Sequence, residues 1–237
     1  ADKMISTVRQ VSAAALARVV PKPSLADRYD FVPAGAYDRA ELMQFALDHF
    51  LATEPHCQAL GITRDNGYGF IEGIIEKCLK HDYSLRIVDR ETDKLIGIRV
   101  MSVIKRGVPY DNGNTTNENE QMMTAILDKL KADFWRLRPE ANKVLLREVT
   151  CVHRDHQRQG IAQFLVHLGL DFNHLRASGI DGIMSEASSI ANQKLLEKNG
   201  YRELSSSDRS QYIRSDGSAV VFPDGTRSLK LFYLNLN

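Results

Sequence analysis

The sequence has few cysteines, no long apolar run and almost no net charge. Cys57, Cys78 and Cys151 are odd in number and far apart, so they predict neither a disulfide framework nor a metal cluster. No apolar run approaches the roughly 18 residues that a membrane span needs. The formal charge of +1 argues against a broad surface for nucleic acid. These absences favour a protein of the reducing cytoplasm that binds no metal, membrane or nucleic acid.

The composition that remains is typical of a globular protein. Hydrophobic residues make up 43% of the 237 positions and charged residues 26%, which is enough apolar material for a single core. We expect one domain over residues 27–237, after an N-terminal extension over residues 1–26. The stretch from Met4 to Ala26 has basic residues and no acidic ones, which superficially resembles a mitochondrial presequence. A mitochondrial location is therefore the alternative to the cytoplasm.

Residues 144–175 carry the most informative pattern. The apolar run from Val144 to Val152 predicts a buried strand. A polar turn containing Gly160 follows, and apolar residues then recur every three or four positions from Ile161 to Leu175, which predicts an amphipathic helix. A strand that turns at a glycine into a helix leaves backbone N–H groups without partners. Together with the positive end of the helix dipole, these groups favour binding of a pyrophosphate.

The segments around this centre alternate between helical and strand patterns. The spacing predicts a helix from Asp38 that stops before Pro55, because proline disfavours helical geometry at Glu54. Further helices are expected over 66–81, from Thr116 or Asn117 to Leu137, and over 189–199, and a loop over 105–119. Strands are expected over 29–33, 83–88, 95–104, 180–186, 212–213, 219–222 and 229–236. This order predicts an α/β fold with a mixed sheet and helices on both faces.

Three segments resemble the GNAT (GCN5-related) N-acetyltransferase superfamily. The pattern Gln157-x-x-Gly160-x-Ala162 is similar to its motif for the pyrophosphate of acetyl-CoA. Residues 188–201 resemble its later motif, a helix that ends in Glu-Lys-x-Gly-Phe/Tyr. Phe50 and Glu54-Pro55 resemble the insect-type arylalkylamine N-acetyltransferases. The resemblance implies the GNAT acyl-CoA N-acyltransferase fold, in which a central mixed sheet has a splayed cofactor strand. It also implies acetyl-CoA as co-substrate and a small-molecule amine as acceptor.

The resemblance also implies roles for particular positions. Glu54 falls at the general base, and Ser188 falls near the leaving thiolate. The expected cofactor residues are the strand positions Thr150, Cys151 and Val152, the turn and helix positions Arg158, Gln159, Gly160, Ile161, Ala162 and Gln163, and the later-helix residue Asn192. Direct attack of the amine in a ternary complex is expected, with the oxyanion bound by a backbone N–H near Cys151 or Val152.

Several alternatives stay open. Glu148 and His153 flank the cofactor strand and are rival bases, and Cys151 would permit an acyl-cysteine intermediate. Leu196 stands where many GNAT enzymes have a tyrosine acid, which leaves a serine (Ser188 or Ser189), a water or no dedicated acid. The acceptor could be a lysine or an N-terminus of a protein. The chain could also be a sensor that binds acyl-CoA without catalysis.

Overall fold

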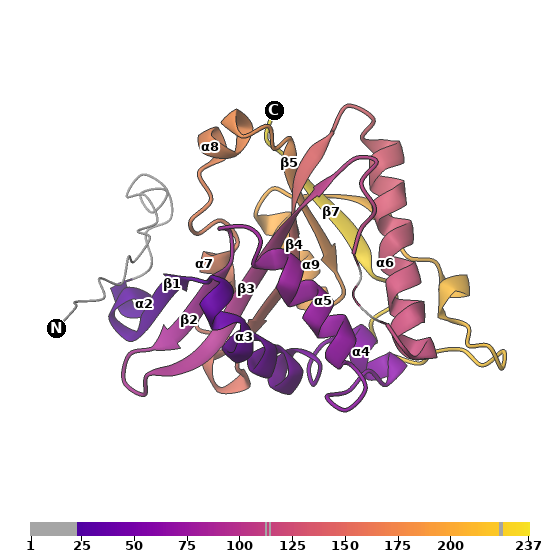
Figure 1. Ribbon diagram of the computed structural model, residues 1–237, viewed down its shortest axis with the longest axis horizontal. Coiled ribbons are helices and arrows are strands. Elements are labelled where there is room, and N and C mark those ends of the chain that lie inside the picture. Colours follow the sequence, from indigo (N-terminus) through magenta and orange to yellow (C-terminus); the bar gives the residue numbers. More distant parts are fainter. Residues whose placement is uncertain (1–22, 112, 114, 223–224) are drawn as a thin grey trace.

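The computed structural model describes residues 23–237 except 112, 114, 223 and 224 (Figure 1). Residues 1–22 of the predicted extension lie outside that part. The centre of the molecule is one seven-stranded sheet in the order β1-β2-β3-β4-β5-β7-β6. Its strands are β1 (Tyr29–Pro33), β2 (Leu85–Asp89), β3 (Lys94–Lys105), β4 (Lys143–Val152), β5 (Gly182–Ala187), β6 (Arg202–Ser206) and β7 (Lys230–Asn235).

The sheet is mixed, as the sequence predicts. Strands β1 to β4 pair antiparallel in chain order, and β7 pairs antiparallel with both β5 and β6. The β4–β5 pair is parallel, because the chain crosses over through helices between these two strands. The one parallel pair therefore lies at the middle of the sheet, directly after the strand that the sequence places at the centre.

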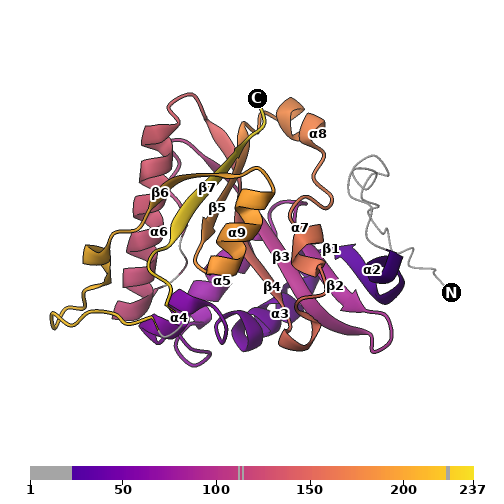
Figure 2. The same ribbon diagram turned by 180° about the vertical axis from the view of Figure 1, so that it is seen from behind.

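Helices cover both faces of the sheet. Helices α3, α4, α5 and α6 lie on the face seen in Figure 1, and α7, α8 and α9 lie on the face seen in Figure 2. The bounds are α2 (Pro23–Arg28), α3 (Arg39–Phe45), α4 (Pro55–Leu60), α5 (Tyr68–Cys78), α6 (Glu118–Leu137), α7 (Ile161–Leu165), α8 (Phe172–Ala177) and α9 (Ile190–Lys198). None of these helices has the length and apolar character that crossing a membrane requires in the described part of the chain.

The buried apolar residues form three clusters, built from the stripes that the helical spacing predicts, and the third packs α7 against the β1–β2 end of the sheet. On the first face, Ile74 of α5 and both Ile126 and Phe134 of α6 pack against β3 and β4. On the second face, Leu175 of α8 and Leu196 of α9 pack against β5 and β7. Asn117 caps α6, since its side chain accepts a hydrogen bond from the Glu120 N–H at 3.0 Å. The predicted α6 boundaries and cap are thus confirmed.

Strands β4 and β5 separate part-way along their length. Their pairing covers only Val144↔Gly182 to Arg147↔Ser185. Beyond that pair, β4 continues along β3 to Val152, and β5 continues along β7 to Ala187. The two strands therefore open into a V whose apex lies at the next residues, Glu148 and Glu186. This is the splayed strand that the family resemblance implies.

The helix predicted over 161–175 is wrong in its length. The structure breaks it into α7 and α8, joined by turns over 166–171. Two buried arginines of the sheet explain the break. Arg99 of β3 donates to the carbonyls of Leu165 and Leu168 at 2.9 and 2.6 Å, and Arg147 of β4 donates to that of Val166 at 2.8 Å. These carbonyls are thus satisfied without continuing the helix. The apolar spacing persists because both pieces still face the sheet.

The helix break predicted at Glu54-Pro55 is confirmed, but the sequence did not predict the short helix after it. Glu54 has extended backbone geometry, φ −77° and ψ 122°, as expected before proline. Pro55 nevertheless begins a second helix, α4, at the position where its missing N–H costs nothing. Glu54 is the N-cap of that helix rather than the end of the previous one, which closes in a π turn over Ala46–Phe50.

The C-terminal strands were only partly predicted. Residues 212–213 and 219–222 form no strand, only an isolated bridge between Ile213 and Ala219, because Tyr212 belongs to a 3-10 turn. A strand that the sequence did not predict, β6, pairs with β7 at the sheet edge. Leu204 is the only apolar residue of β6, so its hydrophobic pattern carries no strand signal.

Candidate active site

A cavity of about 1170 Å³ opens at the splay of β4 and β5. Its walls come from the segment before α4, from α5 and α6, from both strands of the V, and from the turn before α7. Eleven predicted site residues line it: Glu54, Thr150, Cys151, Val152, Arg158, Gly160, Ile161, Ala162, Gln163, Ser188 and Asn192. Residues that lie up to 138 positions apart in the chain are thereby brought to one place.

The turn before α7 presents backbone N–H groups to the cavity. The N–H groups of residues 158–163 donate to no acceptor within the described residues. Arg158 has φ +59° and Gly160 has φ +89°, so two left-handed residues curl the turn around these donors. A Cβ on Gly160 would meet only Leu25, at 3.9 Å, so backbone geometry rather than space requires the glycine there. A concave set of free N–H groups fits a pyrophosphate.

Gln159 is the predicted cofactor residue that does not line the cavity. Its side-chain carbonyl accepts a hydrogen bond from the Tyr29 hydroxyl at 2.8 Å and another from Arg28 at 3.1 Å. The side chain thus fastens the turn to α2 and β1, at the edge of the sheet. Only its backbone N–H belongs to the set of free donors described above.

The free edge of β4 forms the long wall beside that turn. The carbonyl of Val152 accepts a hydrogen bond from the Gln157 side chain at 2.9 Å, which fixes the strand end against the turn. Thr150 accepts from Arg147 at 3.1 Å. Burial raises the pKa of the Cys151 thiol to about 12. A thiol is a poor nucleophile when it is protonated, so this environment disfavours an acyl-cysteine intermediate.

The start of α9 forms the opposite wall. Ser189 caps this helix by accepting a hydrogen bond from the Asn192 N–H at 3.2 Å, which leaves Ser188 one residue outside the helix. The Ser188 hydroxyl forms no hydrogen bond to the described part of the chain. Leu196 is fully buried in the second core. The side chain at the tyrosine position is therefore apolar and packed, whereas Ser188 and Ser189 both line the cavity.

Glu54 lines the cavity with an almost enclosed carboxylate. Its Oε2 atom accepts a hydrogen bond from the Cys57 N–H at 2.5 Å, and its Oε1 atom lies 3.7 Å from Nδ1 of His56. The side chain is only 5% exposed. His56 in turn contacts the Tyr212 hydroxyl through Nε2 at 2.8 Å, and that hydroxyl lies 2.5 Å from Ser207. The proposed base is thus built into a buried polar chain.

The rival histidine stands in a cluster of rings at the cavity wall. His153 packs edge-on against His49 and His156, with ring centroids 4.6 and 5.9 Å away. Burial, with His153 adding to it, lowers the pKa of His49. Nδ1 of His156 contacts the Tyr29 hydroxyl at 3.0 Å. His153 therefore belongs to a group of packed rings beside the turn, and these contacts explain its position without a catalytic role.

The apex of the V holds a buried charged network that the sequence did not reveal. Glu148 accepts hydrogen bonds from Ser102 at 2.5 Å and from Tyr110 at 2.6 Å, and Lys77 lies 3.5 Å from it. Glu186 pairs with Lys131, whose Nζ atom lies 3.2 Å from both carboxylate oxygens. Both lysine ammonium groups also lie near the Tyr110 ring, at 3.6 and 4.1 Å from its centroid. We call Lys77, Tyr110, Lys131, Glu148 and Glu186 the apex network.

Burial shifts the pKa values of Glu186, Lys77 and Tyr110 in the apex network. It raises the pKa of Glu186 to about 7, although Lys131 and Lys77 oppose that shift. It also lowers the pKa of Lys77 and raises that of Tyr110 well above its ordinary value. Glu148 and Glu186 line the cavity, whereas the two lysines stand behind them. The apex therefore presents carboxylates to the cavity and keeps its positive charges in the protein.

Two further features mark the limits of the site. No three side chains of His, Cys, Asp or Glu come close enough in the described residues to hold a metal ion.

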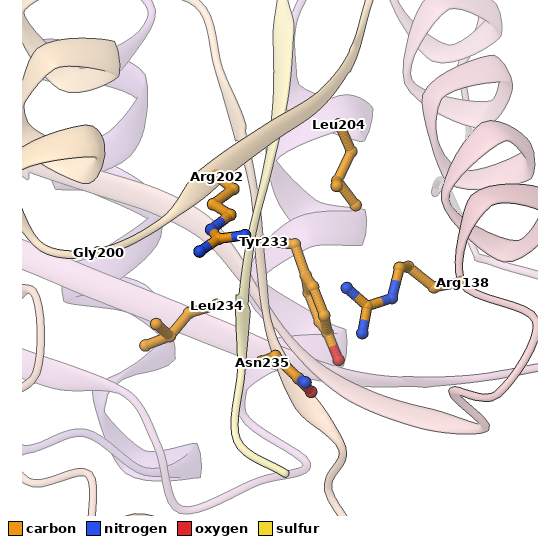
Figure 3. Close-up of a pocket in the computed structure, with 7 residues that line it drawn as sticks. All are labelled: Arg138, Gly200, Arg202, Leu204, Tyr233, Leu234 and Asn235. Atoms are coloured by element: carbon orange, nitrogen blue, oxygen red, sulfur yellow. The ribbon is translucent and has the colours of Figure 1, made fainter.

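A second hollow, of about 350 Å³, lies at the β6–β7 edge of the sheet (Figure 3). Arg138 points there toward the ring of Tyr233, 4.7 Å from its centroid, and also pairs with Glu140 at 2.5 Å. Its charge is thus already compensated within the fold.

Comparisons with solved structures identify this architecture. A putative arylalkylamine N-acetyltransferase 7 from Aedes aegypti superposes with a TM-score of 0.73, at 18% identity over 88% of each chain. Arylalkylamine N-acetyltransferase 2 from the same mosquito gives 0.74, at 14% identity over 88% of this chain and 99% of that one. The chain has the GNAT fold. A third GNAT structure, the polyamine N-acetyltransferase of Drosophila melanogaster, gives 0.71 at 15% identity over 87% and 99%.

These comparisons confirm the GNAT fold that the sequence resemblance predicts. They also confirm that the helices and strands are arranged as in arylalkylamine N-acetyltransferases. No protein-family model matches the sequence, and no curated protein matches it either. At such low identities the likeness shows the GNAT fold alone. The acceptor must therefore be argued from the cavity of this chain.

Proposed function

We propose that this protein transfers the acetyl group of acetyl-CoA to a primary amine, by direct attack in a ternary complex. One observation carries the proposal. The same cavity is lined by the open V of β4 and β5 and by Arg158, Gly160, Ile161, Ala162 and Gln163, whose N–H groups have no acceptor among the described residues. A cradle for phosphates that continues into a gap between strands fits a long cofactor with a pyrophosphate at one end and a reactive group at the other.

The chain's own residues suit that cofactor, which supplies an acetyl group activated as a thioester. Residues Arg158 to Gln163, which form the end of the turn and the start of α7, would hold the pyrophosphate through backbone N–H groups. The free edge of Thr150, Cys151 and Val152 would pair with the pantetheine arm. Asn192 and Ser188 stand on the opposite wall, where we propose that Ser188 meets the leaving sulfur. A backbone N–H near Cys151 or Val152 would bind the developing oxyanion.

The other half of the cavity suits a small amine with an apolar body. Its lining there is mainly apolar and comes from several separate elements: Phe50, Phe70, Ile74, Met123, Leu127 and Leu229. Such a surface favours an aromatic or alkyl group, so we propose an arylalkylamine as acceptor. Glu54 is the proposed base. Because its carboxylate is nearly enclosed, it would reach the proton of the amine through a water.

Two alternative functions make different demands on the cavity. A lysine or N-terminus of a protein would need an open groove, whereas the acceptor half is walled by α5, α6 and Leu229. A sensor without catalysis would keep the phosphate cradle, and the packed Leu196 removes the tyrosine acid, as a sensor would require.

We also propose a cytoplasmic location, because the described cysteines Cys57, Cys78 and Cys151 are all free.

The decisive experiment measures acetyl-CoA binding and amine turnover together. We expect the protein to bind acetyl-CoA and to acetylate members of a panel of arylalkylamines, polyamines and lysine peptides. Gly160→Val should weaken acetyl-CoA binding by roughly tenfold or more, because φ +89° is strained for a β-branched residue and the N–H donors would be displaced. Calorimetric titration of both proteins gives the comparison.

The controls separate the possible failures. Gly179→Val changes a glycine of similar φ, +75°, in the turn after α8, remote from the cavity, and should leave acetyl-CoA affinity unchanged. Equal affinity of wild type and Gly160→Val would remove the pyrophosphate argument. Binding without turnover of any amine would favour the sensor. Glu54→Gln should change the pH profile of kcat/KM, and an unchanged profile would exclude Glu54 as the base.

A further inference from the structure

The apex network calls for an explanation beyond stability. Its four charged side chains are no more than 10% exposed. Removing two ion pairs from water is expensive, and apolar residues of similar volume give comparable or greater stability at such positions. The network also occupies the single point where β4 and β5 part, which is where an acetyl group and an amine would meet in the proposed reaction.

The lysines hold the carboxylates without screening them from the cavity. Lys131 approaches Glu186 from α6, and Lys77 approaches Glu148 from α5. Of the five residues in the apex network, only Glu148 and Glu186 line the cavity. Burial, with the neighbouring Glu148 adding to it, raises the pKa of Glu186 to about 7, so the attraction of Lys131 and Lys77 does not offset the cost of a negative charge at this place. A second cation on the cavity side would help to offset that cost.

The apolar walls continue directly from this point. Ile74 lies three residues before Lys77 on α5, and Leu127 lies four residues before Lys131 on α6. Residues at these spacings share one helix face, so each lysine is aligned with an apolar residue that lines the cavity. A ligand with its ammonium at Glu186 would therefore extend its body along Ile74 and Leu127.

We propose that Glu186, held from behind by Lys131, binds the ammonium group of the acceptor at the apex of the V and restricts acceptors to cationic amines with an apolar body. The inference rests on the proposed function for its chemistry, and it names a specificity residue that the sequence motifs do not contain. Glu148 contributes the neighbouring negative charge. Acidic acceptors are excluded by the same two carboxylates.

Binding of a matched pair of ligands tests the assignment without catalysis. The probes are 2-phenylethylamine and 2-phenylethanol, which share an aromatic body and differ in charge. Wild type should bind the amine roughly tenfold to hundredfold more tightly than the alcohol, the range of a hydrogen bond to a charged group. Glu186→Gln should bring the two affinities to within about threefold. Calorimetry with and without coenzyme A measures both.

Two more variants keep the result interpretable if Glu186→Gln unfolds. The double change Glu186→Gln with Lys131→Met removes both charges of the pair and should still lose the preference for the amine. Glu91→Gln removes one negative charge from the exposed β2–β3 turn. This control variant should keep the wild-type preference for the amine. A double variant that prefers the amine as strongly as wild type would overturn the proposal.

The pH dependence of amine binding gives a second readout. The groups that face Glu186 are Lys131 from α6, Lys77 from α5, Glu148 from β4 and Tyr110 from the loop after β3. The ammonium binds the ionised carboxylate, so amine affinity should rise between about pH 6 and about pH 8 in wild type and stay level in the double variant. A level wild-type profile would also overturn the assignment. Failure to bind acetyl-CoA would refute the proposed function and leave this test intact.

Discussion

Glu54 and Glu186 line the same cavity, and their surroundings differ in kind. Glu54 accepts a backbone hydrogen bond from Cys57 at the start of α4, where the N–H groups and the helix dipole favour a negative charge. Glu186 is buried and accepts hydrogen bonds from the Lys131 ammonium group, but it receives no backbone hydrogen bond from the described residues. Two residues of one type thus acquire different tasks from their environments. The first is held as a helix cap, and the second is left with a charge that a ligand can complete.

The largest expected effect comes from breaking the apex pair. Glu186→Ala leaves Lys131 buried at 6% exposure without its partner, so the free energy of unfolding should fall by about 3–5 kcal/mol. Adding Lys131→Met should recover most of the loss, because the charge that needed compensation is gone. Urea denaturation measures all three proteins. A single variant as stable as wild type would show that the pair is not buried in solution.

A smaller effect is expected at Glu54, and it separates the cap from the base. Glu54→Ala removes the side chain that accepts from the Cys57 N–H, so stability should fall by about 0.5–2 kcal/mol. Glu54→Asp keeps a good cap and should cost less than about 0.5 kcal/mol. Its carboxylate is one methylene shorter, so kcat should nevertheless fall if Glu54 takes the proton of the amine. Parallel loss of stability and kcat in both variants would assign Glu54 to the fold alone.

The smallest effect is expected at Cys151, which lines the same cavity as the two carboxylates. Because burial raises its pKa to about 12, the thiol is protonated near neutral pH and takes no covalent part. Cys151→Ala should leave kcat within about threefold of wild type, which corresponds to less than about 0.7 kcal/mol in the barrier. Steady-state kinetics and mass spectrometry for an acetylated cysteine provide the check. A trapped acetyl group on Cys151 would contradict this expectation.

The sequence predicts those parts of the site that one segment determines. The pattern from Gln157 to Ala162 predicts the phosphate cradle, since a strand, a glycine turn and a helix start are consecutive in the chain. Pro55 likewise predicts the extended geometry at Glu54, because that effect acts between neighbours. The structure has the glycine turn, whose N–H groups find no acceptor among the described residues, and the extended backbone at Glu54. Binding of a phosphate at that turn stays a prediction.

The remainder depends on contacts between distant segments. The apex network joins α5, α6, β4, β5 and the loop after β3, and within the sequence Lys77 and Lys131 are ordinary polar residues of amphipathic helices. The break after α7 depends on Arg99 and Arg147, which come from two strands of the sheet. Strand β6 forms because β7 offers it an edge. None of these causes is visible in a local window of residues.

The two buried arginines have a mechanical consequence. Arg147 donates to the carbonyl of Val166 and lies next to Glu148, the first residue past the last β4–β5 pair. The far end of α7 is therefore tied to the strand that carries the apex, and its near end carries the N–H groups that have no acceptor among the described residues. In the proposed reaction, a displacement of the turn by a bound pyrophosphate would be passed through this hydrogen bond to β4 beside Glu148. Binding energy gained at a remote, unreactive group can in this way be used to align the acetyl group with the amine.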